Sequence, residues 1–329
     1  MKATAKAHSN IALVKYWGKR DERLNLPAVG SISITLKEIY TITSVEFKNN
    51  LKEDVLILNN STAPDAQRKR VSRFLDLIRK EGQFSTPARV VSENNFPTGA
   101  GLASSASAFA SLALAGTTAA GIQKSETQLS ELARLGSGSA ARSIFGGIVE
   151  MNMGTLTDGT DAVARQIASE DYWDIRILIA ITSTEAKKTG STEGMRLSAE
   201  TSPYYQQWLS SSPRDLANMR QAIKFRDFKS LGKISEYSCL KMHALAMSAR
   251  PGLIYWNSTT LECIQAIMEL RKSGIPVYFT IDAGPQVKAI YLPENEDQIQ
   301  KALANIKGVK KIIKTALGPG TTLVGEPSQ

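Results

Sequence analysis

The stretch that most constrains the fold runs from Pro97 to Ser107, with the sequence PTGAGLASSAS. A run of small residues follows it, from Ala108 to Ala120, and ends at Gly121. Alanine and leucine dominate this run, which predicts a helix that stops at the glycine. The first N–H groups of a helix have no internal partner and lie at the positive end of its dipole. Glycines and serines before such a helix therefore predict an anion site, most often for phosphate.

Two common phosphate loops do not match this stretch. No Gly-Lys-Ser/Thr follows the glycines, and the spacing is not Gly-x-Gly-x-x-Gly. The plain alternative is a Gly/Ser turn before a buried helix, with no ligand. One proline, two glycines and three serines within eleven positions favour the anion site.

Length and charge limit the class of protein. The 329 residues suffice for two domains or one large one, and 42% hydrophobic with 22% charged residues is typical of globular proteins. The net charge of +9 allows three explanations: a generally basic surface, nucleic-acid binding, or binding of small polyanions. No long Lys/Arg block occurs and few aromatics lie among the basic residues, so we favour a basic surface together with small polyanions.

Cysteine usage and hydropathy indicate the compartment. Cys239 and Cys263 lie in apolar segments, which predicts free buried thiols in a reducing environment. Two Cys and two His without ligand spacing argue against a zinc site. No apolar run reaches the roughly 18 residues of a membrane span, and the N-terminus shows no signal-peptide core. We expect a cytoplasmic protein that binds neither membrane nor nucleic acid.

Hydrophobic periodicity predicts a mixed chain of strands and helices. Strands are expected at 4–16, 31–36, 41–47, 54–58, 88–92, 148–151, 175–181 and 276–281. Helices are expected at 68–81, from a capping box at Ser125 to Gly136, and at 203–211, 213–224, 227–248 and 256–273. Residues 152–172 are expected to form a loop with a short helical piece. This order supports a two-layer α+β or α/β fold.

Four more strings place polar and charged residues at expected turns. They are NIALVKYWGKRD at 10–21, GSGSAARS at 136–143, KKTGSTEGM at 187–195 and TIDAGPQ at 280–286. An arginine offers a planar fork for a carboxylate or phosphate, and an aspartate at a strand end is exposed by the turn. Taken singly, Lys19, Arg142 and Asp282 each have a plain alternative as a surface or turn residue.

Together these strings resemble the GHMP kinase superfamily, and most closely its diphosphomevalonate decarboxylase family. The phosphate-loop string, the four strings above and the closing LGPGT at 317–321 match in order, over residues 8 to 320. The resemblance implies a two-domain α+β fold. A ribosomal-protein-S5-like ATP-binding domain would span 1–180, a ferredoxin-like domain 181–329, and the active site would lie in the cleft.

The resemblance also implies roles for individual residues. The ATP phosphates would be held by Gly99, Ala100, Gly101, Leu102, Ala103, Ser104, Ser105 and Ser107. The substrate would be held by Tyr16, Trp17, Gly18, Lys19, Arg68, Ser137, Gly138, Ser139, Ala140, Ala141, Arg142, Ser191, Thr192 and Met195. The catalytic group would comprise Asp282, Arg142, Lys19, Ser105 and Asn10. Mg²⁺ would arrive with ATP, without a site made by the protein alone. Arg68 has no tight motif around it and fits a solvated helix face equally well.

The implied reaction converts ATP and (R)-5-diphosphomevalonate to ADP, phosphate, CO2 and isopentenyl diphosphate in the mevalonate pathway. Asp282 would accept or orient the proton of the 3-hydroxyl, Arg142 would hold the carboxylate, and Lys19 would offset phosphate charge. The family is usually homodimeric, which we expect here. Glu93, Asn94 and Asn95 are only candidates for adenine contacts, from their place before the loop.

Two departures from the family pattern leave alternatives open. Val29-Gly30 stands where the family has Asn-Ser, and Gln286 replaces the usual Asn. The first loses two polar groups near the expected substrate pocket. It keeps open a mevalonate or phosphomevalonate 3-kinase, or a decarboxylase specific for a monophosphate. A more distant alternative is a non-catalytic basic module that binds RNA.

Overall fold

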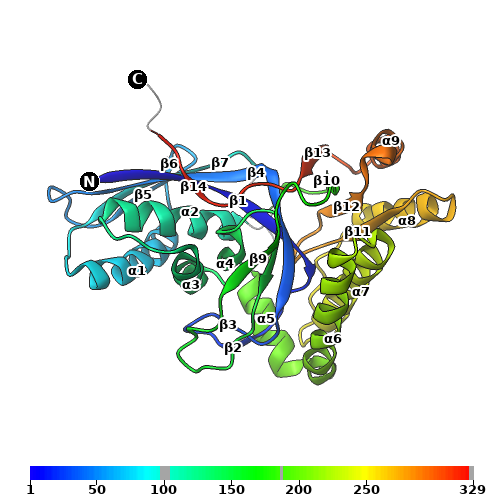
Figure 1. Cartoon of the computed structure of the whole chain (residues 1–329), viewed down its shortest axis with the longest axis horizontal. Helices are drawn as coiled ribbons and strands as arrows, with labels where there is room; N and C mark the ends of the chain where they lie inside the picture. The colour runs from blue at the N-terminus through cyan, green and yellow to red at the C-terminus, as the bar shows by residue number, and fades with distance from the viewer. Residues whose placement is uncertain (97–103, 186–187, 326–329) are drawn as a thin grey trace.

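The computed structural model describes residues 1–96, 104–185 and 188–325. Within them, two large sheets lie side by side, each with its own helices (Figure 1). The first sheet follows the order β14-β1-β4-β7-β5-β6, and β8 and β9 extend it beside β4. Its strands are β1 (Lys2–Val14), β4 (Ser31–Phe47), β5 (Val55–Leu58), β6 (Ser61–Thr62), β7 (Ala88–Asn94), β8 (Ile148–Met151), β9 (Ala164–Ala168) and β14 (Thr322–Leu323).

The long strand β4 contains both strands predicted at 31–36 and 41–47. No turn separates them, because the residues at 37–40 stay within the strand as an irregularity of the bulge type. The partner of β1 on β4 shifts abruptly from Tyr40 to Thr35 at this point. A bulge bends a strand and re-aims its side chains. The antiparallel pair of β1 and β4 thus continues past the irregularity and carries the first sheet toward the second.

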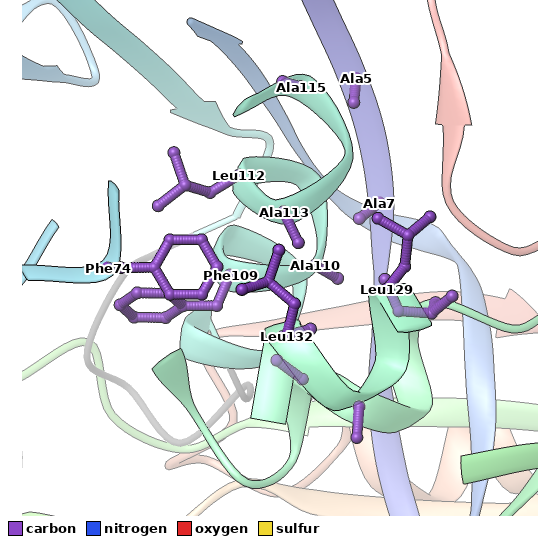
Figure 2. Packing of buried hydrophobic residues seen from close by; sticks show 14 of the residues in the cluster. Ala5, Ala7, Phe74, Phe109, Ala110, Leu112, Ala113, Ala115, Leu129 and Leu132 are labelled. Carbon is purple, nitrogen blue, oxygen red and sulfur yellow. The ribbon is translucent and has the colours of Figure 1, made fainter. Parts of the chain in front are cut away.

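A group of helices covers one face of the first sheet. They are α1 (Asp65–Gly82), α2 (Ser104–Ala119), α3 (Glu126–Gly136) and the short α4 (Ala140–Ser143). Figure 2 shows Ala110 and Ala113 of α2 near Ala7 of β1, and small side chains here allow helix and sheet to approach closely. The rings of Phe74 and Phe109 pack edge to face at 5.3 Å.

Two local predictions in this group are confirmed. The small-residue helix forms, and its described part begins at Ser104. The capping box before α3 is also present: Ser125 Oγ accepts from the backbone N–H of Gln128, whose side chain accepts from the N–H of Ser125. Both predictions depend on residues that are neighbours in the sequence, so they could be made without knowing the tertiary structure.

The second sheet has four antiparallel strands in the order β11-β12-β10-β13. They are β10 (Arg176–Ile181), β11 (Val277–Thr280), β12 (Val287–Tyr291) and β13 (Lys311–Ala316). The accompanying helices are α5 (Ser191–Thr201), α6 (Tyr205–Lys224), α7 (Phe228–Met247), α8 (Ser258–Lys272), the 3₁₀ turn η1 (Pro293–Asn295) and α9 (Glu296–Ala304). A small hairpin, β2 (Lys19–Asp21) with β3 (Leu26–Pro27), projects from the first half.

Two predicted elements differ from the structure. The helices predicted at 203–211 and 213–224 are one helix, α6, which continues through Pro213. Proline removes one backbone donor, and Ser212 Oγ donates to the carbonyl of Trp208 at 2.7 Å beside it. The loop predicted at 152–172 contains strand β9, which pairs with β8. Its five residues alternate weakly, so tertiary pairing rather than pattern determines it.

Sheet membership bears on where the two halves divide. β9 belongs to the first sheet and β10 to the second, which favours a division between them, slightly before residue 180. The chain then returns, because β14 pairs with β1 near the C-terminus. Among the residues that the structure describes, no helix combines the length and apolar character needed to cross a membrane.

Candidate active site

A cavity of about 360 Å³ opens where element ends from both halves of the chain meet. The predicted site residues that line it are Asn10, Tyr16, Trp17, Lys19, Ser104, Ser105, Ser137, Gly138, Ser139, Arg142, Ser191, Thr192, Met195 and Asp282. The end of β1, the β2–β3 hairpin, the first turn of α2, the turn before α4, the first turn of α5 and the turn after β11 supply them. Segments far apart in the sequence thus form one hollow that is lined by several basic and hydroxyl-bearing side chains as well as apolar ones.

Several predicted residues that the structure describes lie outside this lining. Ser107 is fully buried, with its hydroxyl 2.7 Å from Thr41 Oγ. Arg68 forms ion pairs with Glu53 and Asp65. This matches the alternative prediction of a solvated helix-face arginine. Ala140 and Ala141 pack in the core beneath the site, and Gly18 is also absent from the lining. The predicted contacts Gly99, Ala100, Gly101, Leu102 and Ala103 fall outside the described residues.

Arg142 is a buried cation held by neutral groups. Its Nε donates to Ser33 Oγ at 3.0 Å, its Nη1 to Ser31 Oγ at 2.6 Å, and its Nη2 to Asn10 Oδ1 at 3.2 Å. Burial lowers the pKa of Arg142 to about 10, so it remains charged at neutral pH. Neutral partners fix the guanidinium without cancelling its charge, which leaves it available to an anion.

Asn10 connects Arg142 to the hydroxyl-rich turn. Its amide nitrogen donates to the carbonyl of Ser139 at 3.1 Å and to Ser143 Oγ at 2.8 Å. The amide oxygen of Asn10 accepts a hydrogen bond from Arg142. Ser105 Oγ lies 3.1 Å from Ser137 Oγ, so the start of α2 meets the same turn. The two serine clusters that the sequence places far apart therefore adjoin each other.

Asp282 is held by two lysines. Lys15 Nζ donates to its Oδ1 at 2.7 Å, and Lys288 Nζ lies 3.4 Å from its Oδ2. Burial raises the pKa of this carboxyl, but the two ammonium charges outweigh burial and hold the pKa well below its usual range. The aspartate is therefore ionised at any working pH.

Tyr16 contributes a buried hydroxyl that makes no hydrogen bond within the described structure. Burial raises the pKa of Tyr16 to about 12, so the group is a neutral donor. A Cβ at Gly138 would come within 2.2 Å of this hydroxyl, so only glycine leaves room for it. An unpaired buried polar atom at a cavity wall is a natural contact for a ligand oxygen.

The departure at Val29-Gly30 lies in the apolar support of the site. Val29 is buried in a cluster that includes Trp17 and Trp208, and neither Val29 nor Gly30 lines the cavity. A Cβ at Gly30 would approach Leu216 Cδ1 to 2.8 Å. The two residues therefore contribute packing beneath the site rather than side chains that line the cavity.

Sequence reasoning missed other lining residues, namely Ala12, Lys15, Asn25, Arg70, Gly190, Met242 and Ala283. Met242 belongs to the apolar cluster around Trp17 and also borders the cavity. Arg70 donates to the carbonyl of Gly136 at 2.8 Å, and Asn25 donates to that of Leu135 at 2.8 Å. Both polar side chains thus attach to the C-terminus of α3, whose carbonyls lack helical partners.

Comparison with known proteins identifies the family. Residues 7–164 match the diphosphomevalonate decarboxylase-like N-terminal domain, and residues 177–323 match the mevalonate 5-diphosphate decarboxylase C-terminal domain. The chain belongs to the diphosphomevalonate decarboxylase family. Diphosphomevalonate decarboxylase of Homo sapiens is 36% identical, with 98% of this chain and 94% of that protein covered. That of Debaryomyces hansenii is 35% identical, covering 99% and 89%.

Solved structures of the family share the fold. Mevalonate diphosphate decarboxylase from Staphylococcus aureus superposes with a TM-score of 0.93 at 38% identity, covering 98% of each chain. MDDEF in complex with MVAPP, AMPPCP and magnesium superposes with a TM-score of 0.92 at 39% identity, covering 98% of this chain and 99% of that one. The two-domain α+β fold of the family is therefore present here, as predicted.

The lining also indicates how a metal ion would be accommodated. Within the described residues, no three His, Cys, Asp or Glu side chains gather into a metal site. The cavity instead offers hydroxyl oxygens from Ser104 and Ser105, whereas the carboxylate of Asp282 is already paired with two lysines. Mg²⁺ prefers oxygen ligands, keeps several waters, and is often held largely by substrate phosphates. This donor set fits Mg²⁺ carried by a nucleotide.

Proposed function

We propose that this chain converts ATP and (R)-5-diphosphomevalonate to ADP, phosphate, CO2 and isopentenyl diphosphate, a step of the mevalonate pathway of isoprenoid biosynthesis. One observation carries the proposal: Asp282, Arg142 and Lys19 line a single cavity together with two serine-rich turns. An acid, a guanidinium and phosphate-binding hydroxyls are the groups that this reaction requires. Membership in the family supports the same assignment.

Asp282 orients the 3-hydroxyl of the substrate toward the γ-phosphoryl group. Its low pKa makes it a weak base, but the transition state of phosphoryl transfer is loose and needs little proton abstraction beforehand. Positioning and negative charge are therefore its main contributions. Transfer converts a poor leaving group, hydroxide, into phosphate, and the negative carboxylate then offsets positive charge that develops at C3.

Arg142 holds the substrate carboxylate in the orientation for loss as CO2. The bond between C1 and C2 breaks, its electron pair forms the C2–C3 double bond, and the phosphate leaves C3. The carboxylate loses its charge in this step, so its contact with Arg142 is strongest before cleavage. Arg142 therefore acts by orientation, for which its three hydrogen bonds to neutral groups prepare it.

Basic and hydroxyl groups around the cavity hold the phosphates. Burial lowers the pKa of Lys19, whose ammonium lines the cavity near Arg70. Tyr16 offers its unpaired hydroxyl, and we add Arg70 to the predicted set for the substrate diphosphate. Ser104 and Ser105, at the start of α2, hold the nucleotide phosphates with Mg²⁺, which supplies charge neutralisation when bound.

Product analysis tests this function against the kinase alternative. Purified protein, ATP and Mg²⁺ are incubated with mevalonate, its 5-phosphate or its 5-diphosphate, and products are identified by mass spectrometry with CO2 measured in parallel. We expect CO2 and isopentenyl diphosphate from the diphosphate only. Accumulation of a 3-phosphorylated acid without CO2 would instead identify a 3-kinase, and turnover of the monophosphate would identify the other decarboxylase.

We also propose a cytoplasmic homodimer, as the family resemblance implies. Cys239 and Cys263 are both buried free thiols, which supports a reducing compartment. Sedimentation equilibrium of the purified chain tests the dimer, and fractionation of the source cells tests the location. A monomer at micromolar concentration, or a membrane-associated pool, would contradict the respective proposal.

A further inference from the structure

Lys288 occupies an unusual place for a lysine. It lies in β12, between β11 and β10, where it pairs with Thr280 on one side and Ile179 on the other. Its side chain is only 1% exposed. Removing an ammonium from water is costly unless a close anion compensates it. Packing of the sheet alone does not account for a charge at this position.

The anion that Lys288 faces is Asp282, the proposed hydroxyl-orienting residue. Oδ2 of Asp282 is buried, accepts no hydrogen bond of standard geometry from the described residues, and lies 3.4 Å from Lys288 Nζ, within range of an ion pair. Oδ1 accepts a 2.7 Å hydrogen bond from Lys15, which lines the cavity, whereas Lys288 does not. The two ammoniums therefore approach different oxygens, one beside the cavity and one from inside the protein.

The other titratable groups around this carboxylate do not supply a comparable charge. Cys239 and His243, on α7, lie close by, and burial raises the pKa of Cys239 to about 11 and lowers that of His243 to about 3. Both are thus neutral between pH 5 and 9, so that among the described residues the cations facing Asp282 are Lys15, Lys288 and, across the cavity, Arg142. Lys288 is the one that faces the buried oxygen.

We propose that Lys288 is a positioning residue for the reaction: its ammonium holds the buried oxygen of Asp282 in place, so that the other oxygen is fixed toward the substrate hydroxyl. The inference rests on the role proposed for Asp282 above. Without Lys288, burial favours a proton on Oδ2, and the terminal torsion of an aspartate is broad enough to let the group turn. A protonated or rotated carboxyl orients the hydroxyl poorly.

The test compares the full-length wild type with Lys288→Met from pH 5 to 9, in assays of CO2 release. The control is Lys314→Met, which removes a half-exposed lysine of the same sheet paired with Glu296. Loss of the cation raises the pKa of Asp282, so activity that requires the ionised form falls as pH decreases. We expect a new acid limb in Lys288→Met, with activity relative to wild type at least about tenfold lower at pH 5 than at pH 8.

Stability separates this role from a structural one. Methionine matches the volume of lysine, but removing one partner of a buried ion pair is destabilising, so the melting temperature is expected to fall and activity is assayed well below it. Substrate phosphates titrate equally in both proteins, so the ratio of variant to wild type removes their contribution. A constant ratio across the pH range, or a loss of activity that follows a loss of stability alone, overturns the proposal.

Two further variants keep the test decisive if Lys288→Met does not fold. Lys288→Arg retains the charge and is expected to keep the wild-type profile, whereas Lys288→Gln is expected to gain the acid limb. Identical profiles for the two overturn the proposal. If the wild type releases no CO2, the proposed function has failed, and carboxyl carbon NMR of Asp282 in wild type and variant still decides the effect of Lys288.

Discussion

The two central charges of the cavity, the buried Arg142 and the partly exposed Asp282, are surrounded in opposite ways. Arg142 rests on two serine hydroxyls and an amide oxygen, all neutral. Asp282 lies between the ammonium groups of Lys15 and Lys288. Arg142 lies in α4, in the first half of the chain, whereas Asp282 lies in the turn after β11, in the second half.

This difference separates the tasks that the two groups can perform. A buried cation whose partners are neutral keeps its full charge for an incoming anion, and burial makes that charge more effective. An anion with two cations beside it is already compensated, so it contributes direction more than basicity. The first half of the cavity thus attracts the substrate, and the second half aligns its reacting hydroxyl.

The largest expected effect follows from removing the aligned anion. Asp282→Asn keeps the shape of the side chain but removes the negative charge from between Lys15 and Lys288. We expect CO2 release to fall by roughly 10³-fold, within the range for a positioned acid–base group. Nucleotide affinity, measured by calorimetry, should change little, because the phosphates are held elsewhere. Turnover close to that of the wild type would show that alignment does not depend on this carboxylate.

The second test weakens the attraction of the substrate carboxylate by Arg142. Arg142→Lys retains a positive charge but loses the planar fork and at least one of the contacts with Ser31, Ser33 and Asn10. We expect kcat/KM for diphosphomevalonate to fall about 100-fold, as for loss of one well-placed catalytic donor. Arg176→Lys, at a surface pair with Asp174, is the matched control. A decrease of less than threefold would mean that charge alone suffices.

The two halves also differ in how far the sequence could predict them. Contiguous strings placed Tyr16, Lys19 and Arg142 at the cavity, because each string forms one turn whose polar groups face the same way. The clamp of Asp282 by Lys15 and Lys288 could not be predicted. The clamp brings Lys15, directly after β1, and Lys288, in the middle of β12, to the same carboxylate. No local sequence pattern predicts that contact.

Helix rotation explains two further differences. Ser105 lines the cavity and Ser107 does not, just as Arg70 lines it and Arg68 does not. Residues two apart on a helix point in directions about 200° apart, so one of each pair must face away. Composition identified the correct segments, but only packing against the sheet determines which face of each helix meets the cavity.

A smaller effect is expected from the attracting half at Tyr16. Tyr16→Phe removes a buried hydroxyl that has no hydrogen-bond partner among the described residues, so the stability of the free protein should not decrease. Loss of one hydrogen bond to a charged ligand predicts a rise in KM for diphosphomevalonate of about tenfold. Tyr237→Phe, at an exposed position on α7, is the control. An unchanged KM would indicate that this hydroxyl faces no substrate atom.

The smallest effect on activity is expected from the turn that carries Asp282. In this turn Gln286 replaces the asparagine usual in the family. Its Oε1 accepts from the N–H of Thr182 at 2.7 Å, and its Nε2 donates to the carbonyl of Ser183 at 2.6 Å. Gln286→Asn shortens the side chain by one methylene, so at least one bond should be lost at a cost of about 1 kcal/mol in unfolding free energy. Denaturant titration measures this loss.

Activity is the sharper readout for Gln286→Asn, because Asp282 is fixed by its lysines and not by Gln286. If the clamp alone sets the direction of the carboxylate, kcat should remain within about twofold despite the lower stability. If kcat instead falls while stability is preserved, the turn itself orients Asp282. The difference between Asp282, whose charge is compensated by lysines, and the buried Arg142, whose partners are neutral, would then depend on the backbone rather than on charge.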